Sequence, residues 1–121
     1  MHSFCLLAIQ HSLQKFIDVK AAIEDSGASM RSFRKGDVLI APLQGWYDYS
    51  FGDPTKELMQ MWADYRACRW PEDFGPVEAA AHFSAMNPQL DIDAATRVIT
   101  FSHFLPRIDL VPFFVPRKHR I

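Results

Sequence analysis

The spacing of apolar residues predicts two helical stretches in the first part of the chain. From Ser12 onward, apolar residues recur at spacings of three, four and six, which places Leu13, Phe16, Ile17 and Ile23 on one helix face. Ser12 is suited to cap the start of this helix, and Gly27 is suited to end it. A second helix resumes after Pro54 and ends before Pro71, because a residue that precedes proline disfavours the helical region. Its predicted apolar stripe consists of Leu58, Met61, Trp62 and Tyr65.

Two apolar runs have the composition of buried strands. Residues 38–43 follow a glycine suited to a tight turn, and the strand is expected to stop at Pro42. Residues 97–102 are β-branched and nearly continuous in apolarity, which is typical of a strand covered on both faces. A helix is predicted between these runs, from Pro76 to about Met86. This alternation predicts a single domain of α/β class, with a mixed sheet and helices packed on it.

Composition excludes several classes of protein. The chain is 49% hydrophobic, which excludes global disorder, and its net charge of −1 provides no strong field for nucleic acid or an anionic membrane. The short basic run at 117–120 is expected to be solvated. Two cysteines, Cys5 and Cys68, are too few and too far apart for a disulfide framework or a spaced zinc site. No stretch approaches the ~20 apolar residues of a membrane helix, so we expect a soluble, cytoplasmic protein.

His103 stands at the carboxyl end of the second predicted strand. In open α/β sheets, ligands collect beyond this end of the strands. A histidine there can bind a metal through a neutral imidazole nitrogen, or carry a proton near neutral pH. It can equally be a hydrogen-bonded residue at a strand end, and its position alone does not decide between these alternatives.

Three further residues are candidates for contact with a substrate. Trp46 lies in an aromatic loop at 45–54, where it could face the organic part of a substrate or anchor the loop to the core. Asp48 could be a ligand or an acid, or a turn residue that accepts hydrogen bonds from local backbone amides. Arg107 could donate a forked pair of hydrogen bonds to a phosphate, or form an ion pair at the surface.

Three separated stretches carry a family resemblance. The sequences PLQGWYDYSF at 42–51, ADYRACRWP at 63–71 and TFSHFLPR at 100–107 resemble a branch of the calcineurin-like metallophosphoesterases. The resemblance extends from about Ser12 to the last residue. It implies an αββα-type sandwich that hydrolyses phosphoesters with two divalent metal ions, Mn, Fe or Zn. In that family a histidine that ends a central strand is one metal ligand, and His103 matches it.

The chain also departs from the family pattern. The Asp-x-His, Gly-Asp-x-x-Asp and Gly-Asn-His-Asp/Glu motifs would lie upstream of Ser12, the final Gly-His-x-His would follow the last residue, and none of them is present. We therefore expect residues 1–121 to form one partial domain, with a divergent segment at 1–11. The chain would be a fragment or an alternative product of a phosphoesterase. It is expected to be inactive alone and to hold no metal stably, because one imidazole does not fix two ions.

A different class of function is also open. A sheet that lacks neighbouring strands exposes apolar surface and an unpaired edge, both of which favour association. The alternative is therefore a non-catalytic interaction or oligomerisation module. It would bind a second copy or a longer relative through the aromatic loop or an uncovered part of the sheet.

Overall fold

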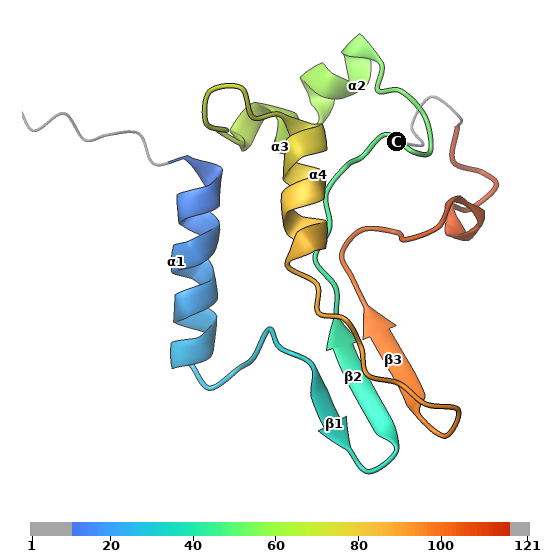
Figure 1. Ribbon diagram of the computed structural model, residues 1–121. Helices are drawn as coiled ribbons and strands as arrows, with labels where there is room; N and C mark the ends of the chain where they lie inside the picture. Colours follow the sequence, from blue (N-terminus) through green and yellow to red (C-terminus); the bar gives the residue numbers. More distant parts are fainter. Residues whose placement is uncertain (1–10, 117–121) are drawn as a thin grey trace, which may run out of the picture.

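The structure, a computed structural model, describes residues 11–116 and has the α/β class that the sequence predicts (Figure 1). The predicted divergent segment, apart from His11, and the basic run at 117–120 lie outside the described residues. In chain order the elements are α1 (Ser12–Asp25), β1 (Phe33–Lys35), β2 (Val38–Pro42), α2 (Lys56–Met61), α3 (Ala63–Ala67), α4 (Pro76–Ala85), β3 (Arg97–Phe101) and a 3₁₀ turn, η1 (Ile108–Leu110).

The three strands form a mixed sheet in the order β1-β2-β3. β1 pairs with β2 in antiparallel fashion, and β2 pairs with β3 in parallel fashion. Gly36 makes the tight turn between β1 and β2 with a φ of 59°, a left-handed conformation that glycine adopts without a steric penalty. The predicted mixed sheet is thus confirmed, whereas the sandwich of two sheets stays a prediction.

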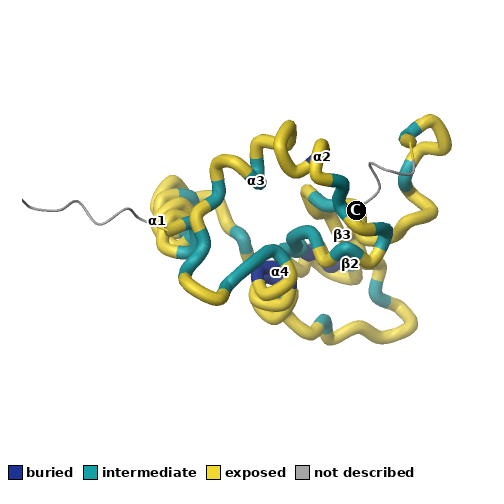
Figure 2. Tube along the Cα trace, turned by 90° about the horizontal axis from the view of Figure 1, so that it is seen from above, coloured by how far each residue is buried: buried dark blue, intermediate teal, exposed yellow. Residues whose placement is uncertain are grey.

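The buried core is small and is formed by residues of β2, α2 and α4. Its members are apolar, and all are at most 7% exposed: Leu39, Ala41, Leu58, Ala79, Ala80 and Phe83. Figure 2 shows the buried parts of α4 and β2 close together. Asn87, just after α4, fixes this arrangement, because its side chain accepts a hydrogen bond from Gln44 N at 2.6 Å and donates one to Gln44 O at 2.8 Å. These two bonds tie the end of α4 to the end of β2.

The prediction that the last strand is covered on both faces is wrong, because all five residues of β3 are exposed. The chain that leads from α4 into β3 crosses one face of the sheet (Figure 1). Arg34, on that face, donates a hydrogen bond to Asp91 O at 2.6 Å. The described residues place no helix or strand over the opposite face, where Ile99 and Phe101 remain 55% and 58% exposed.

The helix predicted after Pro54 is interrupted, and its expected apolar stripe is not continuous. Trp62 has an extended backbone (φ −74°, ψ 128°), which separates α2 from α3. The predicted stripe is also divided within α2 itself, where Leu58 is 2% exposed and Met61 is 62% exposed. Hydrophobic periodicity does not report such a break, because one extended residue leaves the spacing in the sequence unchanged.

The predicted cap at the start of α1 is also wrong by one residue. His11 is the capping residue, and its Nδ1 atom accepts a hydrogen bond from Gln14 N at 3.3 Å. Ser12 is already helical, and its hydroxyl oxygen accepts a hydrogen bond from Arg69 N at 2.8 Å. At the other end, Gly27 has the expected left-handed conformation, with a φ of 90°.

Candidate functional site

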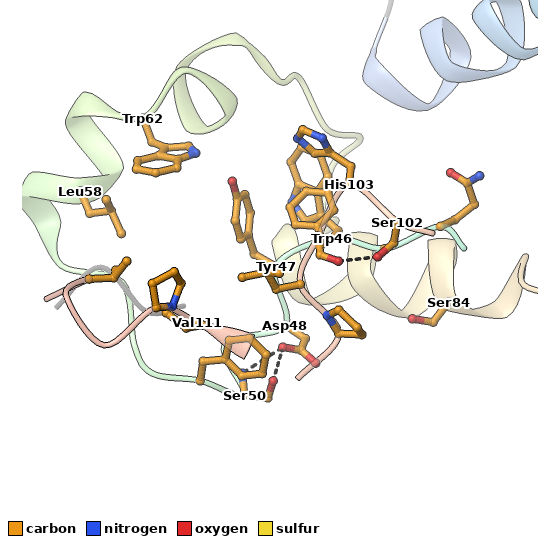
Figure 3. Close-up of a pocket in the computed structure, with 18 residues that line it drawn as sticks. Trp46, Tyr47, Asp48, Ser50, Leu58, Trp62, Ser84, Ser102, His103 and Val111 are labelled. Carbon is orange, nitrogen blue, oxygen red and sulfur yellow. Dashed lines mark hydrogen bonds between the residues drawn. The ribbon is translucent and has the colours of Figure 1, made fainter. Parts of the chain in front are cut away.

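The segments that follow the parallel strands β2 and β3 open into one pocket. Residues from 44–51, which follow β2, and from 102–106, which follow β3, line a cavity of about 460 Å³ together with parts of 111–115 (Figure 3). This volume lies within the usual range for small-molecule sites. The pocket also lies beyond the carboxyl ends of adjacent parallel strands, where α/β proteins bind ligands.

Three of the four predicted site residues line this pocket: Trp46, Asp48 and His103. His103 is far from Trp46 and Asp48 in the sequence, and the parallel pairing of β2 with β3 brings the two segments together. Arg107 does not line the pocket. Its guanidinium donates two hydrogen bonds to the carboxylate of Asp109, at 2.9 and 2.8 Å, which matches the alternative of a surface ion pair.

Asp48 has the geometry of a turn residue. One of its carboxylate oxygens accepts hydrogen bonds from Ser50 Oγ at 2.7 Å and from Ser50 N at 2.9 Å. Both bonds lower the pKa of Asp48 from its ordinary value, and the bond from the Ser50 hydroxyl has the larger effect. The carboxylate is therefore ionised at neutral pH. Among the described residues, no lysine or arginine lines the pocket to balance this charge.

His103 is exposed at the rim of the pocket. Its ring contacts that of Phe104, with centroids 5.3 Å apart. In Figure 3 the imidazole of His103 and the carboxylate of Asp48 lie well apart, on different sides of the pocket. Residues 11–116 contain no group of three or more histidine, cysteine, aspartate or glutamate side chains that could hold a metal ion. The donor set that the structure describes therefore does not fit a two-metal centre.

Trp46 both lines the pocket and anchors its loop. Its ring contacts Trp70 at 5.3 Å, Phe104 at 5.5 Å and Phe83 at 6.3 Å between centroids. These contacts join the aromatic loop to α4 and to the segment after β3. The indole nitrogen of Trp46 is buried without a hydrogen-bond partner, which is uncommon for a tryptophan in a core. The position of Trp46 is thus compatible with contact to a substrate and with anchoring the loop to the core, the two interpretations made from the sequence.

A hydrogen bond between a tyrosine and an aspartate, which the sequence did not predict, supports the same loop. The hydroxyl of Tyr47 donates a hydrogen bond to Asp64 Oδ2 at 2.9 Å, which ties the loop to α3. Burial, together with this bond to a carboxylate, raises the pKa of Tyr47 to about 12. Tyr65 stacks on Tyr47 with ring centroids 5.6 Å apart. Tyr47 and Asp64 both lie in stretches that carry the family resemblance, but no spacing rule links one to the other.

The sheet carries a second candidate surface. Phe33 is opposite Ile40, and Ile40 is opposite Ile99, so these side chains share one face with Phe101, two residues further along β3. Their exposed fractions are 60%, 36%, 55% and 58%. We call these four residues the open sheet face. With aromatic side chains of roughly 200 Å² each, their exposed area is on the order of 400 Å².

No family model, curated protein or solved structure matches this chain. The metallophosphoesterase resemblance therefore rests on the three sequence stretches alone. In the part of the chain that the structure describes, no helix combines the length and apolarity needed to cross a bilayer.

Proposed function

We propose that this chain supplies part of a phosphoester-binding site of the metallophosphoesterase kind, and that it does not hydrolyse phosphoesters alone. The observation that carries the proposal is the common pocket of Trp46, Asp48 and His103 beyond the carboxyl ends of β2 and β3. The resemblance of the segments around these residues to one family is the second line of support. The sandwich architecture of that family is part of the same proposal.

Two of the pocket residues, His103 and Trp46, have distinct places in this proposal. His103 would occupy one metal-ligand position, and Trp46 would face the organic part of the substrate. In the complete site of such an enzyme, two divalent ions activate water and stabilise charge on the phosphoryl oxygens. The described residues do not form that centre, so we assign no hydrolytic step to them. Arg107 could donate to a phosphate oxygen only after its ion pair with Asp109 is broken.

Paramagnetic broadening by Mn²⁺ tests the metal-ligand position. When Mn²⁺ is added to the chain, the imidazole signals of His103 should broaden through a weak, exchangeable contact, and the His103→Ala variant should lose this local effect. His82, an exposed histidine of α4 that does not line the pocket, provides the matched control through His82→Ala. Absence of broadening at His103 would contradict its proposed place.

Hydrolysis of an aryl phosphate ester tests the other half of the proposal. In the presence of Mn²⁺ the chain alone should show no turnover above that of the buffer. Two tightly bound manganese ions, with a turnover that His103→Ala abolishes, would show that the chain forms a complete catalytic centre and would overturn the proposal.

A further inference from the structure

The open sheet face spans all three strands, and Lys35 and Arg97 lie on the same side of the sheet at one of its ends. Phe33 comes from β1, Ile40 from β2, and Ile99 and Phe101 from β3. Each of these side chains is at least 36% exposed, while Leu39 and Ala41, which point to the opposite face of β2, are at most 6% exposed. Within residues 11–116, β2 is therefore covered on the side of Leu39 and Ala41, while the four side chains of the open sheet face remain exposed.

The composition of β3 is that of a strand with two covered faces. Its residues Val98 to Phe101 are β-branched or aromatic, a composition found where both faces of a strand are buried. Natural sheets protect exposed strands with charges or prolines. The one charged residue of β3, Arg97, is bound to Asp37 through hydrogen bonds of 2.8 and 3.1 Å, so its charge is already paired. Arg97 lies on the same side as Ile99 and Phe101 but at the end of β3, and Val98 to Phe101 carry no charge that opposes contact with another apolar surface.

We propose that the open sheet face packs against the same face of a second copy of this chain, which forms a two-layer sandwich. An isologous contact about a twofold axis places apolar side chains against apolar side chains on both partners. Facing sheets pack about 10 Å apart with their strands roughly aligned, so these four side chains would interdigitate. Lys35, at the end of β1, and Arg97, at the start of β3, would stay at the solvated rim.

The area of the patch sets the strength of this dimer. The exposed apolar area, on the order of 400 Å², is about half of the roughly 800 Å² that each partner buries in a typical stable interface. It nevertheless reaches the size at which patches on monomers mark interaction sites. The dimer is therefore weak and forms with increasing concentration.

A second copy could instead extend the sheet along the outer edge of β3. Arg97 N donates to Asp37 O, and Phe101 O accepts from Leu43 N, so these backbone groups point toward β2. Because backbone groups of successive strand residues point to alternate sides, the N–H groups of Val98 and Thr100 point away from β2. Edge pairing would use those two groups, whereas packing between faces does not need them.

Sedimentation velocity over a wide concentration range separates the two arrangements. Phe33→Lys, on the strand farthest from the β3 edge, should weaken dimerisation at least tenfold. Ile99→Lys, at the middle of the face, should do the same. Ile17→Lys alters an α1 residue of similar exposure, 57%, and should leave dimerisation unchanged. Thr100→Pro removes only an outward N–H group and should also leave it unchanged.

Circular dichroism of each variant establishes that the chain remains folded, which is expected because all the substituted side chains are exposed. The inference is overturned if the wild-type chain stays monomeric at every concentration. It is equally overturned if Phe33→Lys and Ile99→Lys dimerise like the wild type, or if Thr100→Pro alone abolishes the dimer, which would assign the contact to the edge of β3.

Discussion

Replacing Ile99 with threonine should weaken dimerisation far more than it destabilises the free chain. Complete burial of an isoleucine side chain stabilises by up to about 3 kcal/mol. Since Ile99 is 55% exposed in the free chain, about half of that stabilisation is left for a partner to supply. Threonine keeps the branched shape that suits a strand but loses most of the apolar gain.

The expected loss of dimerisation free energy is about 1–1.5 kcal/mol for each copy, or about 2–3 kcal/mol for a symmetric dimer. This corresponds to a Kd that is weaker by roughly 30- to 150-fold. The free energy of unfolding of the free chain should fall by only about 1 kcal/mol, because the structure already buries less than half of this side chain. Sedimentation equilibrium measures the first quantity, and urea unfolding of a dilute sample measures the second.

The matched control is Ile17→Thr in α1, where the exposed fraction is 57%. This variant should lose a similar free energy of unfolding and keep the wild-type Kd. The reasoning would be refuted by equal Kd values for the wild type and Ile99→Thr, or by an equal weakening of dimerisation in Ile99→Thr and Ile17→Thr. In either case the apolar contact of the open sheet face would contribute nothing specific.

Three further predictions concern the free chain. Phe83→Ala should lower the free energy of unfolding by about 3–5 kcal/mol in urea denaturation, since Phe83 is 7% exposed and contacts the Phe16 ring; a loss near zero would show that this core is not formed. Thr55→Ala should lower the free energy of unfolding by about 1 kcal/mol in the same measurement, because the Thr55 hydroxyl caps α2 by accepting a hydrogen bond from Leu58 N at 3.1 Å. Thr55→Ser should retain most of this stability, because serine keeps the hydroxyl. Tyr47 should ionise near pH 12 in an ultraviolet titration, above the ordinary 10.0. Because its folded-state pKa is raised, the stability it contributes is complete below about pH 10 and is lost as the pH rises toward 12; a normal titration midpoint would contradict the buried bond to Asp64.

Much of the secondary structure could be predicted because its signals are local. The period of apolar residues in α1, the proline that starts α4 and the strand that stops at Pro42 all depend on neighbouring residues, and the structure confirms them. The left-handed glycines at 27 and 36 follow equally from backbone sterics. These features need no knowledge of the rest of the chain.

Burial depends on the rest of the molecule and could not be predicted in the same way. The composition of β3 indicates a strand that is buried on both faces, but it does not say which polypeptide provides the cover. The extended conformation of Trp62 is likewise invisible to periodicity. The difference between the composition of β3 and its exposure is what directs attention to a second copy.

The candidate site was predictable in part. His103, Trp46 and Asp48 could be chosen from the sequence, and the parallel pairing of β2 with β3 explains why their segments meet. Both interpretations of Arg107 were open in the sequence, and the exposed pair with Asp109 can be seen only in the structure. Contacts such as that of Tyr47 with Asp64 depend on how the loop folds back onto α3, which no spacing rule describes.

Intermolecular nuclear Overhauser effects test the sheet-to-sheet contact most directly. In a concentrated mixture of isotope-labelled and unlabelled chains, the methyl groups of Ile40 and Ile99 should show filtered contacts to the ring protons of Phe33 and Phe101 of the other copy. If the only such contacts join β3 residues across the strand edge, or if none appears although a dimer is present, the open sheet face is not the surface that associates.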